Sequence, residues 1–181
     1  MDHNKVAVIG TGVIGASWAV CFLARGFEVT AWDPAPGSQA RLLAQVERQW
    51  AGAEALGLAE GASPRRLRAC ATLEEAVTDA CFVQESAPEK IELKRSLFAA
   101  MDAAAAAQAI LASSSSGIPA SQFQDACRYP ERVLIGHPFN PPHLIPLVEV
   151  VGGEHTSPQV LQAAMEFYRN VGKRPIRIRR E

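Results

Sequence analysis

The sequence predicts an α/β fold built on a Rossmann-type, doubly wound, mainly parallel sheet. Three observations predict it: strand-like and helical stretches alternate along the chain, a glycine-rich turn follows the first strand, and the first strand, helix and second strand form one βαβ unit. The chain has 181 residues, of which 48% are hydrophobic. Because that length suffices for one full hydrophobic core, we expect residues 1–181 to form a single domain.

The first βαβ unit ends at residue 33. The run Val6–Ile9 is rich in β-branched residues and stops at a glycine, as a strand before a tight turn does. A helical pattern of apolar residues continues to Arg25, and Gly26 stands where a helix C-cap is expected. Phe27–Trp32 then alternates as a second strand. A right-handed crossover of this kind joins neighbouring parallel strands.

The remaining elements repeat the alternation. An amphipathic helix is predicted over 38–58, and Ser63 with Pro64 predicts a short helical turn. Further helices are predicted over 90–107, where an alanine run ends the helix, and over 157–171. The further predicted strands are 69–71, 81–84, 110–113, 133–136, 146–151 and 176–178.

The charge pattern argues against nucleic acid and membrane partners. The formal net charge is −1, and acidic and basic residues are interspersed rather than gathered in a basic stripe. The longest apolar runs, such as Val6–Ile9 and Val133–Ile135, are too short to span a bilayer. The four cysteines form no CxxC pair, no secretory leader is expected before Lys5, and no metal site is predicted. We therefore expect a cytoplasmic protein with reduced thiols and a small-molecule partner.

The clearest functional motif is a phosphate-binding turn. A GxGxxG motif lies between the first strand and the first helix, and its residues are Gly10, Thr11, Gly12, Val13, Ile14 and Gly15. The first glycine allows the tight turn, the second lets a pyrophosphate approach the backbone, and the third lets the helix pack on the strand. The pyrophosphate then contacts free N–H groups at the helix N-terminus. The motif in this context predicts a dinucleotide site.

Asp33 ends the second strand, where a carboxylate can accept hydrogen bonds from the adenosine ribose. A carboxylate there repels the 2′-phosphate of NADP, so we predict NAD as the cofactor. The alternative is a turn aspartate that precedes Pro34, which the dipeptide alone would explain.

A second group of polar residues follows later strands. His137 lies at the end of an apolar strand, where α/β sheets bind ligands, and Glu149 interrupts the apolar run Leu147–Val151. Because a carboxylate in such a strand needs a partner, we expect Glu149 to pair with His137. An imidazole oriented by a carboxylate can remove the proton of an alcohol as hydride leaves.

The serine run Ser113–Ser116 ends the strand over 110–113. Its hydroxyls could bind a substrate oxygen or the nicotinamide carboxamide, although such a run can also be a solvated turn. Acyl transfer through one of these serines is a weak alternative, because no GxSxG motif surrounds them.

Together these motifs resemble the NAD-binding domain of the 3-hydroxyacyl-CoA dehydrogenase family. The motifs are GTGVIG, QESAPE with ELKRSLF, SSSSG and GHPFNPPHLIPLVEVVGG, and the resemblance covers nearly the whole chain. It implies that His137 and Glu149 are the catalytic pair and that Ser116 contacts the substrate oxygen, with Ser115 left open as the alternative. It also implies that Glu85 lies near the cofactor, with Lys90 and Ser113 as further candidates there.

The resemblance further implies the reaction and a second, helical domain. We expect oxidation of a 3-hydroxy acyl or 3-hydroxy acid substrate, and HPFNPP with VEVVGG resembles the L-carnitine dehydrogenase and L-gulonate 3-dehydrogenase (lambda-crystallin) branch more than the fatty-acid branch. Family members continue into a helical domain that forms a homodimer, and this chain is expected to end before it. The alternative is a crystallin-like or nucleotide-sensing protein that binds NAD(H) without turnover.

Overall fold

The computed structural model describes residues 4–181, and their strands form one eight-stranded sheet in the order β3-β2-β1-β4-β5-β6-β7-β8. All neighbouring pairs are parallel except β6 and β7. This is the doubly wound, mainly parallel sheet that the sequence predicts. The strands are β1 (Lys5–Ile9), β2 (Glu28–Trp32), β3 (Leu67–Ala69), β4 (Phe82–Glu85), β5 (Ile110–Ser113), β6 (Val133–Pro138), β7 (Leu147–Gly152) and β8 (Arg174–Ile178).

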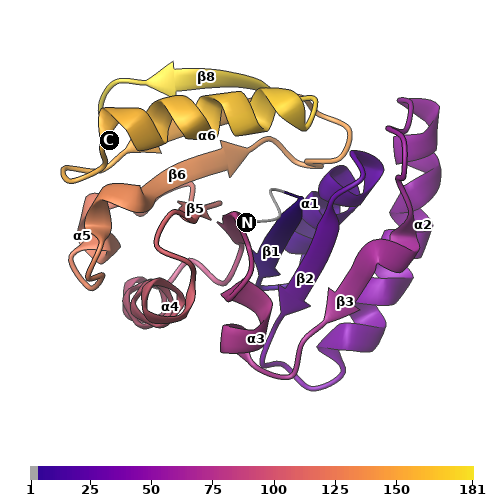
Figure 1. Cartoon of the computed structure of the whole chain (residues 1–181), viewed down its shortest axis with the longest axis horizontal. Helices are drawn as coiled ribbons and strands as arrows, with labels where there is room; N and C mark the ends of the chain where they lie inside the picture. Colours follow the sequence, from indigo (N-terminus) through magenta and orange to yellow (C-terminus); the bar gives the residue numbers. More distant parts are fainter. Residues whose placement is uncertain (1–3) are drawn as a thin grey trace.

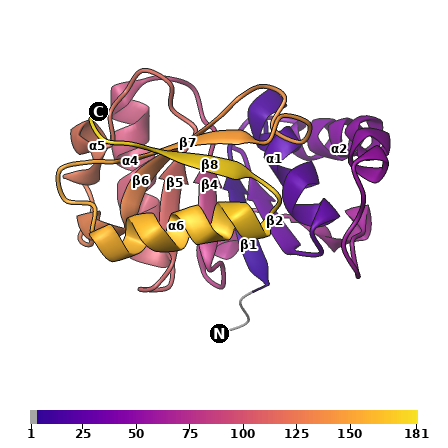
Figure 2. The same ribbon diagram turned by 90° about the horizontal axis from the view of Figure 1, so that it is seen from above.

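Helices cover both faces of the sheet (Figure 1). One face carries α1, α2 and α6, and the other carries α3, α4 and α5. Figures 1 and 2 show α6 lying alongside β8. The helices are α1 (Val13–Ala24), α2 (Ser38–Ala55), α3 (Leu73–Val77), α4 (Ile91–Ala104), α5 (Ser121–Gln124) and α6 (Pro158–Asn170), with 3-10 turns η1 (Pro64–Arg66) and η2 (Pro130–Arg132).

Two apolar cores lie on the two faces of the sheet. On the first face Trp18 of α1 and Tyr168 of α6 are fully buried, and their rings lie 5.6 Å apart. On the second face Phe98 of α4 packs against Phe123 of α5. Parallel strands covered on both faces read as continuous apolar runs, which is the pattern of β1 and β5.

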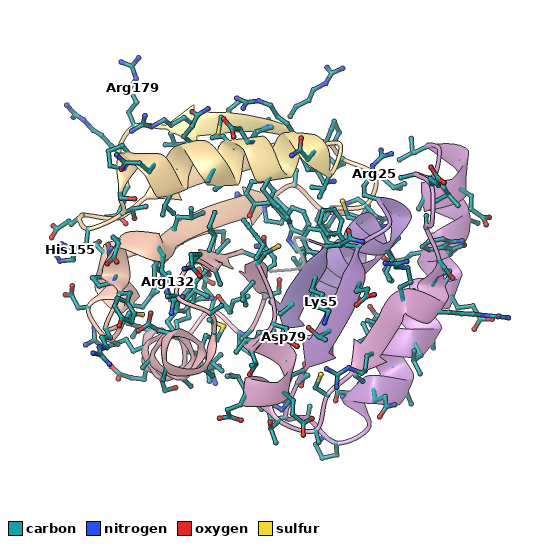
Figure 3. All side chains as sticks on the ribbon, viewed as in Figure 1. Lys5, Arg25, Asp79, Arg132, His155 and Arg179 are labelled. Atoms are coloured by element: carbon teal, nitrogen blue, oxygen red, sulfur yellow. The ribbon has the colours of Figure 1, made fainter. Side chains whose placement is uncertain are left out.

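A buried ion pair connects α4 to the start of β6. Arg132 lies inside the molecule (Figure 3), and its guanidinium contacts Asp102 Oδ1 at 2.8 Å and 2.9 Å. The same side chain donates to the backbone oxygens of Asp102 and Ala106. Both charges of this buried pair therefore have a partner, which buried charges require.

The predicted elements differ from the structure mainly at their ends. The predicted strand over 69–71 is β3 at Leu67–Ala69, and the alanine run after Ala104 lies outside α4. Two short helices, α3 and α5, had no predicted counterpart because each spans about one turn, too little for an amphipathic period to be recognised. No helix of residues 4–181 is both long and apolar enough to cross a membrane.

Candidate active site

The glycine-rich turn has the geometry that a pyrophosphate site requires. Gly10 has φ +84°, and a Cβ there would lie 2.7 Å from the Ala87 nitrogen. A Cβ at Gly15 would lie 1.9 Å from the Gly10 oxygen, whereas a Cβ at Gly12 would meet no atom of the described chain within 4 Å. Gly12 thus leaves an open face at the start of α1, where no side chain caps the helix. Free N–H groups at such a terminus bind anions.

Asp33 stands beside this turn at the end of β2. Its Oδ2 accepts hydrogen bonds from the Thr11 nitrogen at 2.8 Å and the Thr11 hydroxyl at 3.1 Å, and its Oδ1 accepts from the Ala35 nitrogen. A carboxylate has about four lone-pair sites, so Asp33 can accept a further hydroxyl. The structure therefore places this acid beside the glycine-rich turn, and its contact with the ribose stays a prediction.

A cavity of about 530 Å³ opens at this edge of the sheet. Gly10, Gly12 and Asp33 line it together with Trp32 and the segment after β4. Trp32 is partly buried, packs against the apolar core on one face of the sheet and also lines the cavity. An apolar wall and an open glycine cradle fit an adenine nucleotide.

Glu85 and Ser113 belong to a buried ionic cluster centred on Lys94. The Lys94 ammonium contacts the two Glu85 carboxylate oxygens at 3.1 Å and 3.0 Å, and the Ser113 hydroxyl donates to Glu85 Oε2 at 2.5 Å. Burial raises the pKa of Glu85 above its ordinary value, and the Lys94 charge and the Ser113 hydroxyl oppose that shift. Both predicted residues are fully buried in this cluster, so their contact with cofactor stays a prediction.

Lys90 is not part of that cluster. It is the exposed residue that precedes α4, one turn before Lys94. The lysine that pairs with Glu85 is Lys94, which the sequence analysis did not select although it lies within the ELKRSLF motif. A helical spacing of three or four residues after Ile91 would have placed Lys94 on the buried face.

Glu89 is a second acid, whose role the sequence motifs do not predict. Partial burial alone would raise the pKa of Glu89, but the hydrogen bonds from Ser115 and Gly117 outweigh that effect and lower it. Glu89 Oε1 accepts hydrogen bonds from the Ser115 hydroxyl (2.5 Å) and from the backbone N–H groups of Ser116 (3.2 Å), Gly117 (2.9 Å) and Ile118 (3.2 Å). Through these bonds Glu89 anchors the serine loop after β5 to the start of α4.

The predicted histidine and glutamate pair directly. Because β6 and β7 are antiparallel with His137 opposite Glu149, the two side chains meet, and His137 Nδ1 lies 3.0 Å from Glu149 Oε2. Both are partly exposed, at 27% and 33%. A cavity of about 160 Å³ is lined by His137, Glu149 and Ser116. The structure thus brings the three predicted catalytic residues to one place.

The fold and the two cavities define a dinucleotide-dependent class of protein, in which a glycine cradle lies at the same sheet edge as a histidine and carboxylate pair. Residues 5–181 match the model of the 3-hydroxyacyl-CoA dehydrogenase NAD-binding domain. The chain belongs to the 3-hydroxyacyl-CoA dehydrogenase family and carries its NAD-binding domain. NAD is therefore the cofactor of this domain.

The chain is also similar to individual proteins. It is 56% identical over 180 residues to an L-carnitine dehydrogenase of Streptomyces griseus, covering 99% of this chain and 54% of that protein. It is 49% identical to the L-carnitine dehydrogenase of a Pseudomonas species, covering 100% and 57%. A solved structure of 3-hydroxybutyryl-CoA dehydrogenase from Escherichia coli superposes with a TM-score of 0.89 at 29% identity, covering 98% and 38%. The chain spans about half the length of these curated relatives.

Proposed function

We propose that this chain is the cofactor-binding and catalytic half of an NAD-dependent dehydrogenase that oxidises the hydroxyl of a 3-hydroxy acid, with L-carnitine as the leading substrate. The observation that carries the proposal is the His137–Glu149 contact of 3.0 Å in a cavity that Ser116 also lines. The names of the 49–56% identical relatives support L-carnitine. A 3-hydroxyacyl-CoA thioester is the second substrate class, because the family model covers residues 5–181.

His137 acts as the general base. Its Nδ1 faces the Glu149 carboxylate, which only accepts hydrogen bonds, so Nδ1 carries the proton and Nε2 keeps its lone pair. Nε2 then takes the proton of the substrate hydroxyl, and Glu149 stabilises the imidazolium that forms. In the reverse direction the imidazolium returns the proton to the carbonyl oxygen.

Ser116 is the serine that contacts the substrate oxygen. The Ser115 hydroxyl lies 2.5 Å from Glu89 and 2.9 Å from the Ile118 oxygen, so its donor capacity is already used. Ser116 is exposed and lines the same cavity as His137. A hydroxyl donor at the substrate oxygen orients the substrate for proton transfer.

The glycine turn and Asp33 hold NAD. The backbone around Gly12 accommodates the pyrophosphate, and the Asp33 carboxylate accepts from the ribose hydroxyls and disfavours a 2′-phosphate. When bound, NAD accepts the hydride that leaves the substrate carbon. The cofactor roles of Glu85, Lys90 and Ser113, the division of the full-length protein into this domain and a helical domain, its dimerisation and its cytoplasmic location stay predictions from the resemblance.

The cofactor test is a titration of this chain with NADH and, separately, NADPH, followed by nucleotide fluorescence. We expect saturable NADH binding with weaker NADPH binding. A folded sample that binds neither nucleotide would contradict the proposal.

The activity test compares L-carnitine, a 3-hydroxyacyl-CoA and L-gulonate in a chain of the relatives' full length. We expect His137→Ala to lower kcat by roughly 100- to 10,000-fold, the range of general base catalysis, without loss of NADH affinity. His155→Ala is the matched control, because His155 lies on the surface near Asp125 (Figure 3). NADH binding with no turnover of any of the three substrates would favour the nucleotide-sensing alternative.

A further inference from the structure

A chain of hydrogen bonds runs from the core to the cofactor cavity through four side chains. Tyr168 of α6 and Gln84 of β4 are both 0% exposed, and the Tyr168 hydroxyl lies 2.7 Å from Gln84 Oε1. Gln84 Nε2 lies 2.9 Å from the Ser114 hydroxyl, which in turn lies 2.9 Å from the hydroxyl of Ser86. Ser86 lines the 530 Å³ cavity. Buried polar groups are thus linked to the dinucleotide site.

The direction of the first bonds follows from the Gly136 backbone. The Gly136 oxygen lies 3.2 Å from the Gln84 amide and can only accept, so the NH₂ group of Gln84 faces it. The amide oxygen then faces Tyr168, whose hydroxyl donates to it. The same NH₂ group is therefore the donor to Ser114. A Cβ at Gly136 would lie 1.8 Å from the Tyr168 oxygen, so only glycine admits this arrangement.

The direction of the last bonds follows from Ser114. Its oxygen accepts from Gln84 and also from Trp18 Nε1 at 3.2 Å, and an indole N–H is a donor only. A hydroxyl oxygen has two lone pairs, and these two bonds use both. The Ser114 hydrogen is therefore donated to Ser86. Ser86 keeps its own O–H, for which residues 4–181 offer no acceptor within hydrogen-bond distance.

We propose that the Ser86 hydroxyl donates a hydrogen bond to an oxygen of the bound dinucleotide, and that Ser114, Gln84 and Tyr168 are positioning residues that fix the direction of this donor. The proposal rests on NAD binding in the cavity argued above. A dinucleotide offers suitable acceptors in its ribose hydroxyls and phosphate oxygens, and a Ser86 that receives one bond becomes a better donor of the next.

The Gln84 side-chain amide also connects the proposed cofactor contact at Ser86 to His137, the proposed base. Gln84 holds the Gly136 oxygen, and Gly136 directly precedes His137 in β6. A displaced Gln84 would therefore disturb both the donor at Ser86 and the strand that carries the imidazole. This predicts that Tyr168→Phe, which removes the donor to Gln84, affects NADH affinity although Tyr168 is fully buried away from the cavity lining.

The first experiment measures the Kd of NADH for this chain and for Ser86→Ala by fluorescence titration, with a thermal melt of each variant. We expect Ser86→Ala to weaken NADH binding by about 3- to 10-fold, the range of one hydrogen bond, with an unchanged Tm. Ser96→Ala is the matched control, because Ser96 is exposed and its hydroxyl donates to the Leu93 oxygen of its own helix. An unchanged Kd in Ser86→Ala overturns the proposal.

A double-mutant cycle tests the positioning role. Ser114→Ala should weaken NADH binding in the native background and have no further effect in the Ser86→Ala background, because coupled residues are not additive. Equal effects in both backgrounds would overturn the positioning role. Tyr168→Phe takes the place of Ser114→Ala if the latter fails to fold. A native chain that binds no NADH refutes the proposed function itself, whereas native binding with an unaffected Ser86→Ala refutes only this inference.

Discussion

The glycine cradle and the proposed catalytic edge of this domain are built in opposite ways. The cradle lies within the contiguous residues 9–33, and its contacts are mostly backbone groups and one carboxylate at Asp33. The catalytic edge combines the serine loop after β5, His137 of β6 and Glu149 of β7, with Glu89 bracing the loop. The cradle is a local structure, and the catalytic edge is an assembly of side chains from separate segments.

The difference predicts how each region fails. A backbone cradle tolerates changes in neighbouring side chains but not an added Cβ, because the close approaches involve main-chain atoms. A side-chain assembly depends on the charges that hold its segments, and the Glu85–Lys94–Ser113 cluster ties α4 to the ends of β4 and β5. Substitutions in the two regions should therefore have separable effects.

The largest effect is expected from Lys94→Met. Lys94 is 1% exposed, and its loss leaves the buried Glu85 carboxylate without its cation. Removing one partner of a buried ion pair costs about 3–5 kcal/mol. We therefore expect Lys94→Met to lower the free energy of unfolding in urea by that amount. Lys90→Met on the exposed start of the same helix should change it by less than about 0.5 kcal/mol. Equal stabilities of the two variants would contradict the ionic cluster.

Glu149→Gln should separate catalysis from cofactor binding. Glutamine keeps the shape but cannot stabilise the imidazolium, so we expect kcat to fall by about 100-fold, or ~2.7 kcal/mol of activation free energy. NADH affinity should stay the same, because the cradle lies on other strands. Glu154→Gln is the control, because Glu154 is exposed and lies just after the end of β7. An NADH Kd that changes with kcat would mean that the two regions are not independent.

Gly12→Ala and Gly15→Ala should separate the cradle's binding role from its folding role. A Cβ at Gly12 meets no described atom within 4 Å, so the variant should keep its Tm but bind NADH at least about tenfold more weakly, or ~1.4 kcal/mol. A Cβ at Gly15 meets the Gly10 oxygen at 1.9 Å, so that variant should lose stability instead. A Gly12→Ala chain with native NADH affinity would place the pyrophosphate elsewhere.

The smallest effect is expected from Glu89→Gln and depends on pH. The pKa of Glu89 is lower in the folded chain, so its carboxylate stabilises the fold above the usual glutamate pKa of about 4.3. That contribution is lost as the pH falls through the folded-state pKa. Between about pH 6 and pH 3, the native chain should therefore lose more stability than Glu89→Gln. The measurement is the Tm of the native chain, of Glu89→Gln and of the exposed control Glu92→Gln at each pH. An equal loss of Tm with falling pH in the native chain and in Glu89→Gln would contradict the prediction.

Much of the fold could be predicted because its signals are local. Ile110–Ser113 is a strand at the predicted bounds, and Ser157 caps α6 where the Ser-Pro pair predicts a helix start. Glu89 and Lys94 escaped prediction although both lie in quoted motifs. Their side chains contact each other at 3.5 Å, but their other side-chain partners are 9 to 29 residues away in sequence, and the motifs do not indicate which residues those are.

The sequence by itself determined the βαβ unit, the dinucleotide turn and the twelve-residue spacing of His137 and Glu149. Only the tertiary structure decided that β6 and β7 run antiparallel, which sets the two side chains opposite each other. Tertiary packing also decided that Gln84 faces Tyr168 and Ser114. The physical reason is that turn and helix signals depend on neighbouring residues, whereas the partner of a buried polar group depends on which strands the sheet brings together.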